Sequence, residues 1–184
     1  RFGLPFVFIG SSAERFADVS SVGSDITQAV RLGLDHLVSK GHPAPCLILG
    51  PKSRLARARF LRAVHEHCVE RDVDPAILAV EDGEYTVEGG RMAMRRLLER
   101  PHVGHVSVFA ANDMMALGAM MAVREAGLDC PRDVSILGFD GIPSGEFAWP
   151  GLTTVAKPGR AIGERAVEGL FDEIEHKPEH RRIF

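Results

Sequence analysis

The sequence of 184 residues has few cysteines, one tryptophan, one tyrosine and no long apolar run. Its three cysteines, Cys46, Cys68 and Cys130, are far apart and odd in number, which argues against a disulfide framework and favours a reducing compartment. No apolar stretch approaches the ~20 residues of a membrane-spanning helix, and the first residues lack the features of a signal peptide. These absences predict a cytoplasmic protein with no membrane segment.

Charge and motifs exclude further classes. The 22 basic and 25 acidic residues give a net charge of −3, with no basic patch beyond a short arginine run, which disfavours a DNA-contacting module. Neither G-x-G-x-x-G nor G-x-S-x-G occurs, so an enzyme is not expected. The pairs His65/His67 and His102/His105 lack a third ligand nearby and are expected at the surface or in loops. We therefore expect no metal and no cofactor.

Strand and helix signals alternate along the chain, which predicts an α/β fold with parallel sheets covered on both faces. With 45% hydrophobic residues, the chain can build a core in one or two domains. Apolar runs predict strands over residues 6–9, 46–49, 77–80, 106–110, 134–139 and 152–155. Helical periodicity predicts helices over residues 26–40, 55–71, 87–100, 114–126 and from Pro158 onward.

Two of the predicted strands end abruptly in polar side chains. Asn112 and Asp113 follow residues 106–110, and Asp140 follows residues 134–139. The carboxyl ends of parallel strands converge on the crevice where open α/β folds bind ligands. Because no nucleophile or metal-ligand spacing accompanies them, the pattern favours holding a small polar molecule over transforming it. Asp113, directly before a helix, is interpreted as an N-cap, and Asp140 could instead brace the turn before Gly141.

Three linked motifs resemble one family. They are Asn112-Asp113 with Ala116 and Gly118, Ser135–Asp140, and Leu152-Thr153-Thr154-Val155. Their order and spacing resemble the lactose-repressor/galactose-repressor family of bacterial transcription regulators, and the likeness covers nearly the whole chain. It implies a two-lobed, Rossmann-like core of the type I periplasmic-binding-protein kind. Residues 43–154 would form the C-terminal lobe, and residues 1–42 with 155–184 the remainder of an incomplete N-terminal lobe.

The resemblance also implies partners. Such regulators carry a helix-turn-helix headpiece before the core, and no segment of this sequence resembles one, so operator binding is expected only through a headpiece absent from this chain. A small-molecule effector is expected between the lobes. Asp140 would accept hydrogen bonds from ligand hydroxyls, Asn112 would offer an amide donor and acceptor, and Tyr85 would stack on the ligand. A bracing role for Asp140 and an ordinary loop aromatic at Tyr85 stay open.

Three further ligand contacts are weaker predictions. Arg57 lies in an arginine run where the family carries one effector-binding arginine, but alignment on Phe60 would put Ala56 at that position. Lys157 follows the strand at 152–155 where the family often has glutamine, and a solvated lysine is an equal alternative. Asp25 begins a helix, so capping is its default role and ligand contact the minority reading.

The helix at 114–126 is apolar on almost every face until Arg124, and such a helix must be buried all round. The sheet covers only part of it. The resemblance implies a homodimer, with Leu117 and one or both of Met120 and Met121 at the seam. Plain burial within one chain is the alternative.

The favoured function is the effector-sensing, dimerising core of a transcription regulator, with a sugar as the favoured effector. A periplasmic sugar-binding protein of a transport system shares the fold, and an upstream signal peptide would identify it. An α/β enzyme is the third reading, and turnover of candidate sugars would reveal it.

Overall fold

A computed structural model describes residues 4–10, 19–101, 104–175 and 182–183 of the chain. The chain divides into two compact units. Unit 1 comprises Arg1–Asp25 with Lys157–Phe184, and unit 2 comprises Ile26–Ala156. In the described part of the chain, no helix combines the length and the apolar character that crossing a bilayer requires.

Unit 2 contains the predicted parallel sheet. Its five strands lie in the order β4-β3-β5-β6-β7, and every neighbouring pair is parallel. The strands are β3 (Cys46–Leu49), β4 (Val80–Asp82), β5 (Val106–Ala110), β6 (Val134–Asp140) and β7 (Thr153–Ala156). The helices are α1 (Ile26–Ser39), α2 (Leu55–Val69), α3 (Val87–Leu98) and α4 (Asp113–Glu125).

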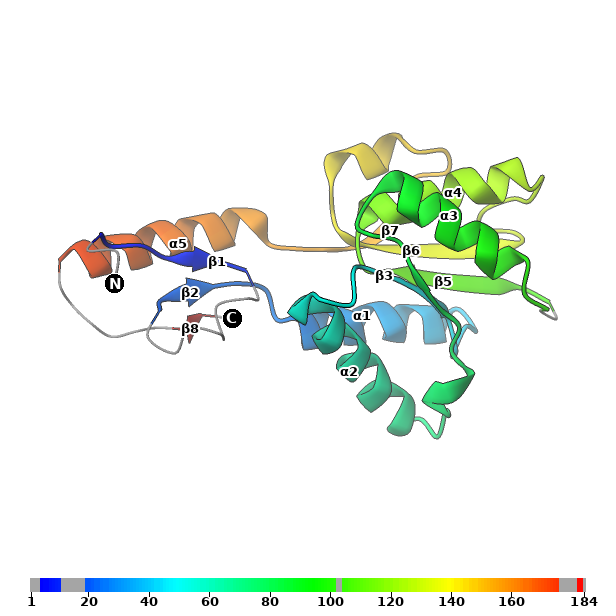
Figure 1. The fold of residues 1–184 in the computed structure, drawn as a ribbon, viewed down its shortest axis with the longest axis horizontal. Helices are drawn as coiled ribbons and strands as arrows, with labels where there is room; N and C mark the ends of the chain where they lie inside the picture. Colours follow the sequence, from blue (N-terminus) through cyan, green and yellow to red (C-terminus); the bar gives the residue numbers. More distant parts are fainter. Residues whose placement is uncertain (1–3, 11–18, 102–103, 176–181, 184) are drawn as a thin grey trace. The chain divides into compact units, whose positions relative to one another are not determined.

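The sheet of unit 2 is covered on both faces, with α1 and α2 on one and α3 and α4 on the other (Figure 1). Successive residues of a strand point to opposite faces. In β5, Val108 and Ala110 join the core cluster beneath α3 and α4, whereas Phe109 joins the cluster beneath α1 and α2. A strand buried on both faces reads as a continuous apolar run, which is why β5 was predictable from sequence.

Helix α1 belongs to unit 2, which begins directly after Asp25. The apolar stripe of α1 accounts for this, because Val30, Leu34 and Leu37 are buried in the same cluster as Phe109 and Leu137 of the sheet. Unit 2 ends at Ala156. The lobe boundaries expected at 42–43 and 154–155 stay a prediction.

Helices α3 and α4 approach each other at backbone distance. A Cβ built on Gly118 of α4 would lie 1.9 Å from the carbonyl oxygen of Val87 in α3. Only glycine fits such an approach. On the inner side of α4, the small residues Ala116, Ala119 and Ala122 are completely or almost completely buried. The outward side of α4 carries the methionines described below.

Unit 1 holds a three-stranded parallel sheet in the order β1-β2-β8 and helix α5 (Gly159–Ile174). Its strands are β1 (Phe8–Ile9), β2 (Ser21–Val22) and β8 (Arg182–Ile183). Ser20 next to β2 donates a hydrogen bond from Oγ to Glu173 of α5. Among the described residues of this unit, the apolar residues that are buried are Val22 and Ala166.

Of the predicted strand at 77–80, only Val80 lies in a strand. Pro75–Ile77 form a 3₁₀ helix, η2, and β4 begins only at Val80. The cause is local, because the Asp74 side chain accepts a hydrogen bond of 2.9 Å from the Ala76 amide and Pro75 has the φ of a helix start. The 3₁₀ helix η3 (Pro143–Phe147) occupies the loop between β6 and β7.

Candidate functional site

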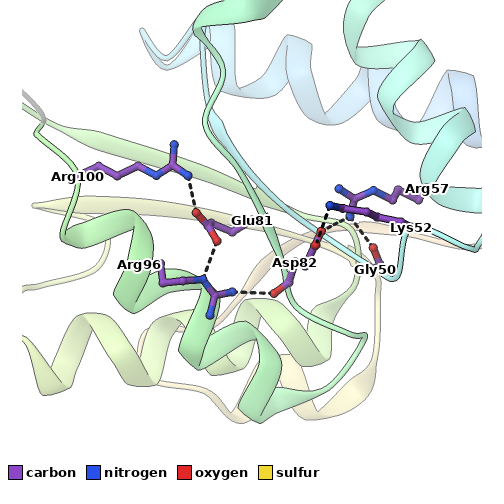
Figure 2. Close-up of polar contacts among 7 residues, drawn as sticks. All are labelled: Gly50, Lys52, Arg57, Glu81, Asp82, Arg96 and Arg100. Carbon is purple, nitrogen blue, oxygen red and sulfur yellow. Dashed lines mark hydrogen bonds and ion pairs between the residues drawn. The ribbon is translucent and has the colours of Figure 1, made fainter.

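Polar side chains gather at the carboxyl ends of β3 and β4. Arg57, in the first turn of α2, donates from Nη1 to the Gly50 carbonyl oxygen and to Asp82 Oδ1, both at 2.6 Å (Figure 2). Its side chain is only 10% exposed. Lys52 Nζ lies 3.8 Å from the other oxygen of Asp82. Arg57 therefore braces two strand ends. Its contact with a ligand stays a prediction.

A second set of ion pairs fixes β4 from the side of α3. Glu81, whose side chain is 13% exposed, accepts hydrogen bonds from Arg96 Nε at 2.6 Å and Arg100 Nη2 at 2.5 Å (Figure 2). Burial raises the pKa of Glu81, but the two guanidinium groups outweigh it and hold that pKa below its usual range. Arg96 also donates to the Asp82 carbonyl oxygen. Strand β4 and the Asp82 side chain are thus held in place from both flanks.

Tyr85 lies over the end of β3. A Cβ added to Gly50 would come within 2.0 Å of Cζ of the Tyr85 ring, so the ring occupies the space that a side chain at position 50 would need. Burial raises the pKa of the Tyr85 hydroxyl, the charges of Arg54 and Arg57 lower it, and that of Asp140 raises it. The phenol therefore shares one electrostatic environment with Arg57 and Asp140.

Asn112 is the N-cap of α4. Its Oδ1 accepts a hydrogen bond of 2.9 Å from the Met115 amide, and its Nδ2 donates to the Tyr85 carbonyl oxygen at 3.3 Å. The interpretation of Asp113 as the cap is wrong by one residue, because Asn112 has the extended backbone of an N-cap and Asp113 is already helical. Asn112 thereby links α4 to the loop that carries Tyr85.

Asp113 is fully buried and ties three segments together. Its Oδ2 accepts hydrogen bonds from the amides of Gly141 and Ile142, both at 2.8 Å, and its Oδ1 accepts one of 2.6 Å from the Thr154 hydroxyl. A carboxylate with three donors is well satisfied despite its burial. Sequence reasoning missed this role, although Asp113 and Thr154 belong to two of the linked motifs.

Asp140 ends β6 with a φ of 130°, which L side chains rarely adopt. Tyr85 and Glu84 also have positive φ, at 60° and 55°. Strained backbone of this kind concentrates at functional sites. The structure thus brings four of the predicted ligand residues, Arg57, Tyr85, Asn112 and Asp140, to the carboxyl ends of the strands of unit 2. Asp25 and Lys157 are exposed and belong to unit 1.

The outer side of α4 carries an exposed apolar stripe. Met114 and Met121 are 41% and 49% exposed, and Leu117 between them is partly exposed. Their spacing of three and four residues places them on one face. Met120 instead packs partly buried against the core. The expected burial on every side is therefore not met within one chain, because Met114 and Met121 stay exposed while Met115, Val123 and the small residues of α4 are buried.

Two further exposed aromatic residues were missed by sequence reasoning. Phe147 and Trp149, in the loop between β6 and β7, are 86% and 85% exposed. Arg124 near the end of α4 donates from Nη2 to the Trp149 carbonyl oxygen at 3.0 Å, which attaches the loop to the helix. The signal available was the single tryptophan within a loop rich in proline and glycine.

Across the described residues, no group of three or more His, Cys, Asp or Glu side chains is arranged to hold a metal ion. His67, expected near the surface, is instead 2% exposed, and its Nε2 lies 3.0 Å from Asp35 Oδ1. His65 is exposed, and His102 lies outside the described residues. The hydrogen bond from His67 lowers the pKa of Asp35.

Similar proteins were found by sequence. The transcriptional regulator reg1 of Streptomyces lividans is 40% identical over 181 residues, covering 96% of this chain and 51% of that protein. MalR of Streptomyces coelicolor is 38% identical and covers 96% of this chain and 51% of its own length. Both are named HTH-type transcriptional regulators. The chain thus spans about half the length of the curated relatives it matches.

Solved structures resemble the chain over most of its length. A LacI family regulator from Enterococcus faecium with bound ribose gives a TM-score of 0.85 at 25% identity, covering 97% of this chain and 66% of that one. The complex of the regulator CelR with cellobiose gives 0.83 at 30%, covering 98% and 56%. The lac repressor dimer bound to operator gives 0.86 at 26%, covering 100% and 62%.

Residues 34–183 match the family described as the periplasmic binding protein-like domain. The relatives with this domain are transcriptional regulators, and the part of the LacI-family structures that resembles the chain is their effector-binding core. This agrees with the expected fold class. The chain therefore belongs to the family of periplasmic binding protein-like domains, in the form found in the effector-binding core of LacI-family regulators.

Proposed function

We propose that this chain senses a small polar effector, a sugar in the first instance, for a bacterial transcription regulator. The support is the set of polar groups at the carboxyl ends of the sheet in unit 2, where α/β folds bind ligands. Relatives with bound ribose and bound cellobiose support a sugar. Operator DNA would be bound by a helix-turn-helix headpiece of the full regulator, as the names of the relatives indicate.

The observation that carries the proposal is the pair Tyr85 and Asp140, both held at positive φ and electrostatically coupled. Asp140 would accept hydrogen bonds from sugar hydroxyls, and Tyr85 would stack on the apolar face of the ring. Asn112 holds the Tyr85 loop in place and would contribute its remaining acceptor capacity. Arg57, with Nη1 engaged by Gly50 and Asp82, would use its other nitrogens. Lys157 and Asp25, which belong to unit 1, stay predicted ligand contacts.

Effector binding would regulate DNA binding by shifting a conformational equilibrium of the core. A ligand shifts such an equilibrium only by the difference between its affinities for the two states. The effector therefore has to contact groups whose positions differ between them.

A thermal-shift screen of sugars, sugar phosphates and nucleosides tests the effector site. A ligand at 100 times its dissociation constant stabilises the folded protein by about 2.7 kcal/mol, a shift of a few degrees in Tm. We expect a sugar hit that is lost in Asp140→Ala and kept in Asp129→Ala, whose carboxylate is exposed. A hit that persists in Asp140→Ala would place the effector elsewhere. Turnover of the hit sugar would instead indicate an enzyme.

We further propose that the stripe Met114, Leu117 and Met121, with Phe147 and Trp149, is the homodimer interface. Contiguous exposed apolar side chains mark protein contacts, and a twofold interface would bring the same stripe from each copy together. The lac repressor structure is described as a dimer. The proposed interface includes the predicted seam residue Met121, whereas Met120 packs inward.

Analytical ultracentrifugation of Met121→Glu tests the interface. The charge would be desolvated in a dimer, so we expect the dissociation constant to rise at least tenfold. Val69→Glu on α2 is the matched control, because Val69 is 56% exposed but lies outside the stripe. Equal association of the two variants would remove α4 from the interface.

A further inference from the structure

A cavity of about 790 Å³ lies in unit 2 away from the proposed effector contacts. It is formed at the amino ends of β5 and β6, by the end of α1 and by the loop before β7, and includes His42, His105, Ser135 and Leu152 in its lining. Asn112 and Asp140 stand at the opposite, carboxyl ends of β5 and β6. Its volume is in the range of small-molecule sites.

One wall of this cavity is a chain of hydrogen bonds through two stacked imidazoles. The rings of His42 and His105 lie 4.4 Å apart between centroids and 19° from parallel. His105 Nδ1 is 3.1 Å from the Arg132 carbonyl oxygen, and His105 Nε2 is 2.9 Å from Ser135 Oγ. Ser135 Oγ is in turn 3.4 Å from His42 Nε2.

The Arg132 carbonyl fixes the order of donors, because it can only accept. His105 Nδ1 must therefore carry a proton, and its neutral Nε2 accepts the hydroxyl proton of Ser135. The Ser135 oxygen then accepts from His42 Nε2. A second proton on His105 would turn its Nε2 into a donor to Ser135 Oγ, and the Ser135 hydroxyl would then be available to a ligand. A second proton on His42 would leave this order unchanged, because its Nε2 already donates.

The lining is basic on one side and apolar on the other. His36 and Lys40, near the end of α1, add two basic groups to the imidazole pair. No acidic residue is among the described residues that line the cavity, although Asp133 interacts electrostatically with His105 and the whole chain has a net charge of −3. Met120 and Leu152 supply apolar surface. A site with this division of chemistry suits a ligand with an anionic group on an apolar body.

We propose that this cavity is a second small-molecule site, which binds an organic anion whose carboxylate or phosphate is held by His42, His105, Lys40 and Ser135. The apolar part of the ligand lies against Met120 and Leu152. Burial and the charge of His105 lower the pKa of His42, and a bound anion offsets both effects. The site is separated from Asn112 by the length of β5, roughly 15 Å at about 3.3 Å per residue.

Isothermal titration calorimetry with three matched probes tests this proposal on the 184-residue chain. The probes are 1-naphthyl phosphate, 1-naphthoate and the uncharged 1-naphthalenemethanol. We expect at least one anion to bind at least tenfold more tightly than the alcohol. His105→Gln and Lys40→Gln should each weaken the anion by roughly tenfold, since each removes a charge-assisted partner. The preferred anion decides between a phosphate and a carboxylate ligand.

Asp140→Ala is the control at the other end of the sheet and should leave anion binding unchanged. Lys40 is exposed, so its variant keeps the test valid if the substitution at His105 disturbs folding, which circular dichroism would reveal. Absence of anion binding to the unaltered chain, equal affinity for the alcohol, or full affinity in Lys40→Gln and in a folded His105→Gln would each overturn the proposal. Loss of binding in Asp140→Ala would transfer the anion to the carboxyl end and likewise overturn it.

Discussion

The two ends of the five-stranded sheet in unit 2 differ in how their polar groups are occupied. At the carboxyl ends, Arg57 bridges β3 and β4, and Asp113 binds two loop amides and a hydroxyl of β7. The Tyr85 ring fills the space over Gly50. At the amino ends, a cavity of about 790 Å³ is bordered by a stacked pair of histidines and one serine.

The two ends can therefore bind a ligand in different ways. The carboxyl ends are preorganised, because side chains of the protein already fix the loops that carry Tyr85 and Asp140. A ligand that binds there loses little free energy to ordering these groups, because they are already ordered in the folded protein. The amino ends are open and basic, so a ligand there must supply the countercharge itself. Substitutions should accordingly lower the free energy of unfolding strongly at the carboxyl ends and weakly at the amino ends.

The largest effect is expected for Asp113→Ala. The substitution leaves two amides and the Thr154 hydroxyl without their buried acceptor, which should cost about 3–5 kcal/mol in the free energy of unfolding. Urea denaturation followed by circular dichroism measures it. Asp113→Asn retains one acceptor oxygen and should lose less. A loss below about 1 kcal/mol for the alanine variant would contradict the role of Asp113 as a tie.

An intermediate effect is expected for Gly50→Ala. The new Cβ would lie 2.0 Å from the Tyr85 ring, so the ring must move, at a cost of about 1–3 kcal/mol. Gly151→Ala at the amino-end cavity is the matched control, since its nearest neighbour would be 3.8 Å away, and it should change stability by less than about 0.5 kcal/mol.

A double-mutant cycle locates the cause of the Gly50 effect. If the ring is the obstacle, Gly50→Ala should cost much less in a Tyr85→Ala background, which urea denaturation of the four proteins would show. Additive losses would mean that the Gly50 backbone, not the ring, sets the requirement for glycine.

The smallest effect concerns pH at the amino ends. The pKa of His42 is lowered in the folded state by burial and by His105, so the unfolded chain takes up the proton more readily. The stability from neutral His42 is present above the unfolded pKa of about 6.5 and is lost as pH falls through it. Between about pH 7.5 and about pH 5.5, the free energy of unfolding should therefore fall less in His42→Gln than in the unaltered chain. An equal loss would show that His42 contributes nothing to this window.

Much of the fold followed from sequence, since β5 and β6 are mostly apolar runs and α1 has a clear apolar stripe. The errors are local competitions. Asn112 takes the cap that was expected of Asp113, because it is the residue with the extended backbone at that point. The Asp74 side chain turns the expected start of β4 into a 3₁₀ helix.

The candidate site was predictable to the extent that strand ends are predictable. Asn112 and Asp140 follow apolar runs, and topology alone brings such residues to one edge. The histidine–serine chain was not predictable, because Ser135 is 30 residues from His105 and 93 from His42. Nothing in local sequence marks side chains that meet only through the order of the strands. The braced state of Arg57 depends in the same way on Asp82, 25 residues away.

The bonds of Asp113 also have a mechanical consequence. β7 is the last strand of unit 2, and the chain passes from its final residue, Ala156, into unit 1 at Lys157. Through Thr154, a pull on that crossing segment reaches Asp113, and from Asp113 it reaches the amide that follows Asp140. One buried carboxylate thus acts as a joint, and a strain applied along the chain at Lys157 would be felt as a change in the angle at which Asp140 is presented.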